Sequence, residues 1–146
     1  MTEIRRLDHI ALIVSDTTEA LAYYCDRLGL RVESSEELTE PAVRLTYLDA
    51  GSILIQLIEP LSDSGMLAQV LAERGEGFHH LCFSVDDVAA VAAALADQTG
   101  ATPALGKGRG RTSAFIPGPP HHGTLVELNQ FRRTEDIDER PGLLEG

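Results

Sequence analysis

The chain has 146 residues, of which 43% are hydrophobic and 24% charged, enough for one compact domain with an ordinary core. Its formal net charge of −11 argues against nucleic acid or an anionic membrane surface as the main partner, because both require a positive field. Two cysteines favour free thiols over a disulfide framework, and no apolar run has signal-peptide or membrane-span length, so we expect a cytoplasmic protein.

The first part of the chain is predicted to place a helix between strands. An apolar, β-branched run opens it, Asp16 can cap the first turn of the helix that follows, and Gly29 can end that helix. The predicted elements are a strand at 7–14, a helix at 18–28, an extended segment at 31–34, a polar loop at 35–41, and strands at 42–48 and 52–59.

The second part repeats this plan after a connector. The predicted elements are a connecting helix at 66–74, a strand at 78–85, a helix at 88–98, a glycine-rich basic turn at 106–111, and strands at 112–116 and 124–129. We therefore divide the chain into a first βαβββ module (1–60), a helical connector (61–77), a second βαβββ module (78–131) and an acidic tail that we expect to be mobile (132–146). The predicted fold is α+β, with the modules forming a pseudo-twofold curled sheet around a metal-binding cleft.

Four polar residues recur at one constant offset. His9 and His80 are 71 positions apart (80 − 9), and so are Gln56 and Glu127 (127 − 56). Imidazole nitrogen, amide oxygen and carboxylate oxygen together suit a divalent ion such as Co, Ni, Mn, Zn or Mg. The alternative is four unrelated polar residues, but a Gln or Glu in the middle of an aliphatic strand is costly unless it is hydrogen-bonded or coordinated.

Several motifs carry a resemblance to a known superfamily. DHI at 8–10, QLIEP at 56–60, GEGFHHLCFSVDD at 75–87 and LVEL at 125–128 resemble the vicinal oxygen chelate superfamily of glyoxalase I, bleomycin-resistance proteins and extradiol dioxygenases. Within it, the chain is most similar to the methylmalonyl-CoA epimerase family, over about residues 7–130. The resemblance implies a metal-dependent isomerase of an acyl-CoA thioester, usually a homodimer.

The same resemblance implies roles for individual residues. The metal ligands would be His9, Gln56, His80 and Glu127. The family removes the α-proton of a malonyl thioester to give a metal-stabilised enolate, and its base lies in a motif like PEQGVR. The matching stretch here is TEPAVR at 39–44, which makes Glu40 the candidate base and Glu127 a candidate for the opposite face.

Two stretches depart from the family pattern or leave their role open. His121 and His122 stand where these epimerases have a lysine-containing turn, and their role can be general acid, substrate contact, extra ligand or plain exposed turn. The basic turn with Lys107, Arg109 and Arg111 can hold coenzyme A phosphates or be a solvated hairpin.

Two other functions remain open at this point. A glyoxalase I-type lyase shares the same chemistry and is poorly separated by sequence. A metal-free protein that binds a small molecule or drug is a different class, which the complete ligand set and the 5% aromatic content argue against.

Overall fold

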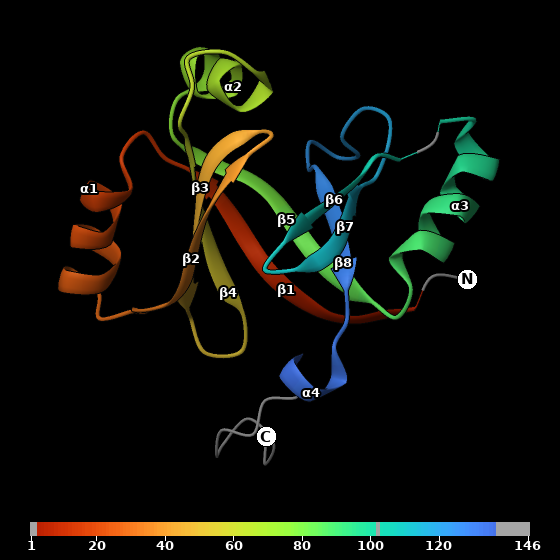
Figure 1. Cartoon of the computed structure of the whole chain (residues 1–146), viewed down its shortest axis with the longest axis horizontal. Helices are drawn as coiled ribbons and strands as arrows, with labels where there is room; N and C mark the ends of the chain where they lie inside the picture. Colours follow the sequence, from red (N-terminus) through yellow and green to blue (C-terminus); the bar gives the residue numbers. More distant parts are fainter. Residues whose placement is uncertain (1–2, 102, 137–146) are drawn as a thin grey trace. The chain divides into compact units, whose positions relative to one another are not determined.

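The computed structural model describes residues 3–101 and 103–136 (Figure 1). They form an α+β fold with two βαβββ modules, as predicted. The first contains β1 (Ile4–Ile13), α1 (Thr17–Leu21), a π-helical turn (Ala22–Arg27), β2 (Arg31–Thr39), β3 (Ala42–Asp49) and β4 (Leu54–Pro60). After α2 (Met66–Arg74), the second contains β5 (Gly77–Val85), α3 (Val88–Thr99), β6 (Leu105–Gly108), β7 (Arg111–Phe115) and β8 (Val126–Gln130), and α4 (Arg133–Asp136) follows. Among these residues, no helix is both long and apolar enough to cross a membrane.

The two modules share one strand topology. In the first, β1 runs parallel to β4, and β4, β3 and β2 follow as antiparallel neighbours. In the second, β5 runs parallel to β8, and β8, β7 and β6 follow in the same way. Ala11 pairs with Gln56, and Cys82 pairs with Glu127, each partner displaced by 71 residues. The repeat in the sequence is therefore also a repeat in strand register.

The helices of the two modules begin and end alike. The side chains of Asp16 and Asp87 each accept a hydrogen bond from the backbone N–H three residues on, at 3.1 and 3.0 Å. Such a bond satisfies one of the N–H groups left without a partner in the first helical turn. Gly29 and Gly100 follow the helices with φ angles of 87° and 75°, a region that a residue with a Cβ rarely adopts. The predicted helix signals at Asp16 and Gly29 are confirmed.

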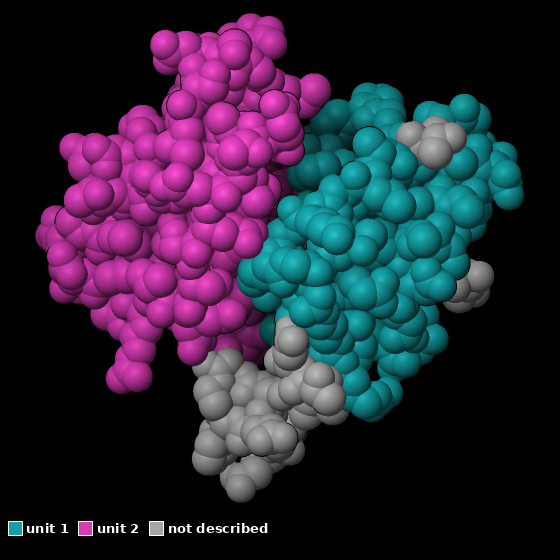
Figure 2. All heavy atoms as spheres, viewed as in Figure 1, with its two compact units in different colours: residues 1–8, 81–146 teal, residues 9–80 magenta. Residues whose placement is uncertain are grey.

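The chain divides into two compact units, drawn in different colours in Figure 2. Unit 2 is residues 9–80, and unit 1 is residues 1–8 together with 81–146. Strand β1 thus begins in unit 1 and ends in unit 2, whereas β5 begins in unit 2 and ends in unit 1. As a result, His9 and His80 belong to the same unit although 70 residues separate them.

Unit 2 has an apolar core on each face of its sheet. One face packs against α1 and buries Val14, Leu48 and Leu57. The opposite face buries a second cluster, to which Leu67 of α2 adds partial cover: Ala11, Val43, Leu45, Tyr47 and Ile58. Side chains alternate along a strand, so His9 lies on the same face as Ala11.

Unit 1 repeats this separation of faces. Its buried cluster of Val85, Val88, Ala114 and Leu128 lies on the side of α3. Glu127 precedes Leu128 and therefore points to the other face. In both units the Gln or Glu of the repeat lies on the sheet face away from the helix.

Two segments predicted as loops are partly strand, which corrects the sequence interpretation. The polar stretch 35–41 belongs mostly to β2, and only Glu40 and Pro41 form the turn to β3. The basic stretch 106–111 is a hairpin of β6 and β7, whose turn residues Arg109 and Gly110 have φ angles of 54° and 70°. Two positive φ angles match the twist of flanking strands in a tight hairpin. β2 and β6 are exposed outer strands, so they lack the clear alternation of apolar residues on which the prediction relied. They are held as strands by hydrogen bonds to one neighbouring strand.

The segment predicted as an acidic tail begins with α4. Asp136, its last residue, is buried and accepts hydrogen bonds from Arg111 at 2.6 and 2.7 Å. The rest of that prediction, residues 137–146, lies outside the described residues.

Candidate metal site

The imidazoles of His9 and His80 face each other inside unit 2. Their Nε2 atoms are 3.4 Å apart, and the residues are 3% and 2% exposed. The ring planes cross at 72°, with centroids 5.5 Å apart. The two rings therefore face each other through their Nε2 atoms, an arrangement compatible with a shared ion.

The separation of the two nitrogens fits one divalent ion. Imidazole nitrogens bind zinc-like ions at about 2.1 Å, so two of them lie about 3.0 Å apart at a right angle and about 3.4 Å apart at a tetrahedral angle. The observed 3.4 Å between the Nε2 atoms of His9 and His80 falls in this range.

Gln56 brings an oxygen to the same sheet face. It is 6% exposed on β4, where its register partners are Ala11 on β1 and Tyr47 on β3. Its Nε2 donates to the hydroxyl of Tyr47 at 2.9 Å, while its Oε1 has no hydrogen-bond partner among the described residues. A buried amide oxygen without a partner costs about 1–3 kcal/mol, a cost that a bound cation would remove. The donor set of unit 2 therefore fits a metal.

Glu127, the fourth predicted ligand, belongs to unit 1. It is half-buried on β8, opposite Cys82 on β5 and Phe115 on β7. Burial raises the pKa of the Cys82 thiol, and the negative charges of Glu127 and Asp8 raise it further. Cys82 is therefore a protonated thiol beside Glu127.

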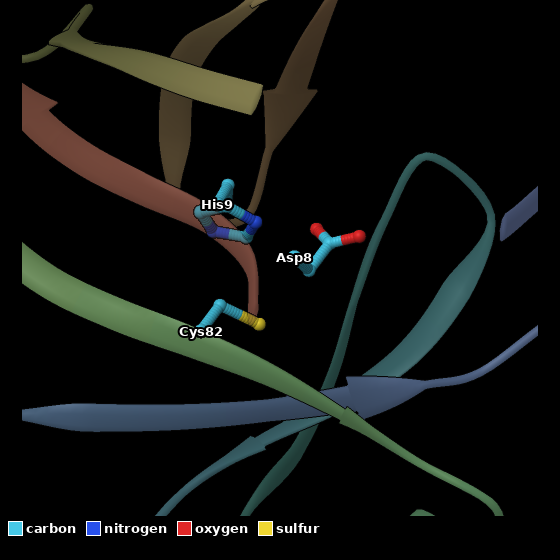
Figure 3. A group of neighbouring side chains, drawn as sticks. All are labelled: Asp8, His9 and Cys82. Atoms are coloured by element: carbon cyan, nitrogen blue, oxygen red, sulfur yellow. The ribbon is translucent and has the colours of Figure 1, made fainter. Parts of the chain in front are cut away.

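Asp8 is a second buried carboxylate of unit 1. Figure 3 shows it on β1, with the next residue, His9, and with Cys82 on β5. A carboxylate oxygen of Asp8 and the sulfur of Cys82 lie within 4.8 Å of each other. The guanidinium of Arg109 donates to Asp8, which is 1% exposed. This ion pair gives the buried charge of Asp8 its counterion.

Glu40 is exposed in the turn between β2 and β3, just before the strand that carries Tyr47, the register partner of Gln56. The structure brings His9, Gln56 and His80 to one face of unit 2. Glu40 belongs to the same unit.

The remaining candidates lie at the surface or are paired with carboxylates. His121 and His122 are exposed in the turn before β8. Arg109 and Arg111 form ion pairs with Asp8 and with Asp136, so these two arginines are not exposed phosphate ligands.

Sequence reasoning missed two contacts around the predicted ligands. Tyr47 holds the amide of Gln56, and the Nδ1 atom of His79 lies 2.7 Å from that of His80. Tyr47 was detectable in principle, because it is the cross-strand partner of Gln56 once the β3–β4 register is known. The contact of His79 with the His80 ring has no sequence signal, because it depends on side-chain conformation.

The chain matches the model of a known protein family. The family model of the Glyoxalase/Bleomycin resistance protein/Dioxygenase superfamily matches residues 8–115. The chain therefore belongs to this superfamily, which confirms the resemblance inferred from its motifs.

Its relatives include several epimerases. The chain is 31% identical to the ethylmalonyl-CoA/methylmalonyl-CoA epimerase of Cereibacter sphaeroides, over 87% of this chain and 98% of that protein. It is similar in structure to methylmalonyl-CoA epimerase from Mycobacterium tuberculosis, with a TM-score of 0.77 and 27% identity over 92% of this chain and 94% of the other. Streptomyces coelicolor methylmalonyl-CoA epimerase in complex with 2-nitronate-propionyl-CoA gives a TM-score of 0.76 and 30% identity over 88% and 98% of the two chains.

Proposed function

We propose that the protein is a divalent-metal-dependent isomerase that epimerises an acyl-CoA thioester of the methylmalonyl-CoA type by removing and returning its α-proton. The observation that carries this proposal is the buried pair of Nε2 atoms of His9 and His80, 3.4 Å apart. The same sheet face holds the Oε1 atom of Gln56, which has no hydrogen-bond partner within residues 3–101 and 103–136. The similarity to epimerases, one of them in complex with an acyl-CoA analogue, supports the reaction class.

The proposed ligands are His9, Gln56, His80 and Glu127, for Co, Ni, Mn, Zn or Mg. A divalent cation there would supply positive charge beside the thioester oxygen, where negative charge develops as the α-proton leaves. The amide nitrogen of Gln56 donates a hydrogen bond to the hydroxyl of Tyr47, so the amide oxygen is the atom that would bind the metal. The apolar cluster around Ala11 on the same face limits water near the reacting carbon.

For proton transfer we propose Glu40 as the base and Glu127 as the group on the opposite face of the α-carbon. The TEPAVR motif supports Glu40 as the base. Because Glu40 is exposed in the β2–β3 turn, this role is the first assignment to test. A general base must come within hydrogen-bond distance of the proton that it removes.

The test measures α-proton exchange directly. The Co²⁺-loaded protein is incubated with methylmalonyl-CoA in D₂O, and deuterium incorporation at the α-carbon is followed by NMR. We expect exchange by the wild type, and a loss of at least 100-fold in His80→Ala and in Glu40→Gln. Glu33→Gln, which removes a carboxylate from an exposed position, is the matched control.

The outcomes separate the parts of the proposal. Wild-type protein that binds Co²⁺ but exchanges no α-proton is not an epimerase of this substrate. The two epimers of the substrate are tested separately, because each proposed base faces only one of them. Exchange of both epimers that survives Glu40→Gln removes Glu40 as a base and leaves Glu127 as the proposed proton carrier.

We also propose that the protein is a homodimer in solution, as the family resemblance implies. Light scattering during size-exclusion chromatography tests this, because the monomer mass is 15.8 kDa and a dimer would have twice that mass. A peak at the monomer mass would contradict the proposal.

A further inference from the structure

His79 and His80 contact each other through the ring nitrogens nearest the backbone. Their Nδ1 atoms are 2.7 Å apart, and the rings cross at 77° with centroids 5.0 Å apart. Neighbours on a strand point to opposite faces, so these side chains can meet only close to the main chain. The contact therefore leaves the Nε2 atom of His80 directed to His9, 3.4 Å away.

This short contact limits how protons can be distributed between the rings. Two nitrogens at 2.7 Å form a hydrogen bond, which needs one proton between them. A neutral imidazole carries a proton on one nitrogen and a lone pair on the other. If His80 donates from Nδ1, its Nε2 keeps the lone pair that a metal ion requires. If His79 donates instead, the proton of a neutral His80 sits on Nε2 and blocks that atom.

We propose that His79 is a positioning residue that accepts the Nδ1 proton of His80 and so holds His80 in the tautomer whose Nε2 is open to a cation. This inference rests on the proposed metal site. Residues that accept the second proton of a histidine ligand fix its tautomer and ring orientation, and their loss commonly lowers metal affinity 10–100-fold.

The start of β5 is held independently of His79. The carboxylate of Glu76, just before the strand, accepts from the backbone N–H of Ser15 at 2.9 Å and from its hydroxyl at 3.2 Å. Ser15 lies two residues after the end of β1, so this contact ties the beginning of β5 to the end of β1. Replacing His79 by a residue without an acceptor therefore removes the hydrogen bond to His80 while the contact between Glu76 and Ser15 remains.

The test compares two substitutions at one position. His79→Asn keeps an acceptor, because the Asn Oδ1 occupies nearly the place of the imidazole Nδ1. His79→Leu fills similar space without an acceptor. Two readouts are used: ¹⁵N–¹H NMR of the ion-free protein, which assigns the tautomer of His80, and calorimetric titration with Zn²⁺.

We expect His80 to be protonated at Nδ1 in the wild type and in His79→Asn, with similar Zn²⁺ affinity. In His79→Leu we expect a mixture of tautomers and a 10–100-fold lower affinity, with a circular dichroism spectrum like that of the wild type. Equal tautomer populations in the wild type and His79→Leu, or an equal loss in both variants, would overturn the inference. A wild type that binds no Zn²⁺, Co²⁺ or Mn²⁺ contradicts the proposed function instead, and the spectrum of the ion-free protein then decides the role of His79 alone.

Discussion

Gln56 is buried, and its Oε1 atom accepts no hydrogen bond from the part of the chain that the structure describes, so its cost to stability and its proposed role as a ligand are linked. Replacement by Met, of similar length, removes this Oε1 atom and the hydrogen bond to Tyr47. We predict that Gln56→Met leaves the ion-free protein within about 1 kcal/mol of wild-type stability, because the unpaired oxygen is lost together with one hydrogen bond.

The same variant should respond less to metal. At a concentration 100 times the dissociation constant, a bound ion stabilises a protein by about 2.7 kcal/mol, and a tenfold weaker affinity lowers this by about 1.3 kcal/mol. Thermal unfolding with and without Co²⁺ measures both effects. Gln69→Met, at an exposed position on α2, is the control. An unchanged response to Co²⁺ in Gln56→Met would exclude Gln56 as a ligand.

The stability of the start of α1 depends on pH through the carboxylate of Glu59. Its carboxylate accepts from the backbone N–H and the hydroxyl of Thr17, at 2.9 and 2.6 Å, and from Arg44 at 3.1 Å. Burial alone would raise the pKa of Glu59, but the bonds from Thr17 and the charge of Arg44 outweigh it, so the pKa is lowered. Because the pKa of Glu59 is lower in the folded state than in the unfolded state, its carboxylate stabilises the fold at a pH above the unfolded value near 4.5. This stabilisation is lost as the pH falls through the lower pKa of the folded state.

We predict that Glu59→Gln reduces the free energy of unfolding at pH 7 by about 1 kcal/mol, the usual value of a helix cap. The difference from wild type should shrink as the pH falls below about 4.5, because the wild-type carboxylate then becomes neutral as well. Urea unfolding between pH 3 and pH 7 measures this, with the exposed Glu33→Gln as the control. A difference that stays constant with pH would show that the charge of Glu59 does not matter.

At the residue scale, the constant offset in the sequence predicted that His9 and His80 lie together, but it did not predict the residues around them. His9 and His80 could be paired because a constant offset marks equivalent places in a repeated fold. Neither Tyr47 nor His79 has a similar residue 71 positions away in the sequence. Their contacts depend on strand register and side-chain conformation, which sequence patterns do not determine.

At the element scale, apolar periodicity identified the buried strands and the helices, and it failed for exposed strands. Helix α2 was predicted with the bounds that it has, Met66–Arg74, because its apolar residues follow the helical period. β2 alternates exposed and half-buried residues of mainly polar type, so its sequence looks like a loop. Its strand character comes from hydrogen bonds to β3, a partner that cannot be inferred from β2 itself.

The attachment of α4 gives a prediction about a buried ion pair. Arg111 on β7 and Asp136 at the end of α4 each have side chains 4% exposed. Removing one partner of such a pair leaves an uncompensated buried charge and costs about 3–5 kcal/mol. We predict a loss of this size in Arg111→Met, measured by urea unfolding.

A matched double variant separates the ion pair from simple packing. Arg111→Met with Asp136→Leu replaces both charges by apolar side chains and should recover most of the loss, because no buried charge remains. The exposed Arg74→Met serves as the control. If the double variant is less stable than the single one, the charge explanation is wrong.

At the scale of the whole molecule, the path of the chain crosses between the compact units twice. The repeat predicted two modules of one topology, and the strand pairing confirms that topology. The crossing could not be predicted, because periodicity identifies a strand without showing which neighbours each of its ends contacts. Unit 2 extends to residue 80, and unit 1 includes residues 1–8.

This crossing makes each module dependent on the other. A fragment of residues 1–64 lacks the part of β5 that belongs to unit 2, and a fragment of residues 65–146 lacks the part of β1 that belongs to unit 1. We predict that neither fragment folds alone and that an equimolar mixture regains structure. Circular dichroism and the dispersion of amide NMR signals measure this. A folded single fragment would contradict the prediction.

The two modules also carry the same two residue types in opposite order. β4 has Gln56 followed by Glu59 at its helix cap, and β8 has Glu127 followed by Gln130, whose oxygen accepts from Val88 at the start of α3. Two identical chains related by symmetry can offer only an even number of carboxylates to a shared centre. A single chain whose two halves have diverged is not bound by this symmetry and can offer one carboxylate. With the proposed ligand set, a single carboxylate would leave a dipositive ion half of its charge for an incoming electron-rich group, whereas two carboxylates would neutralise it.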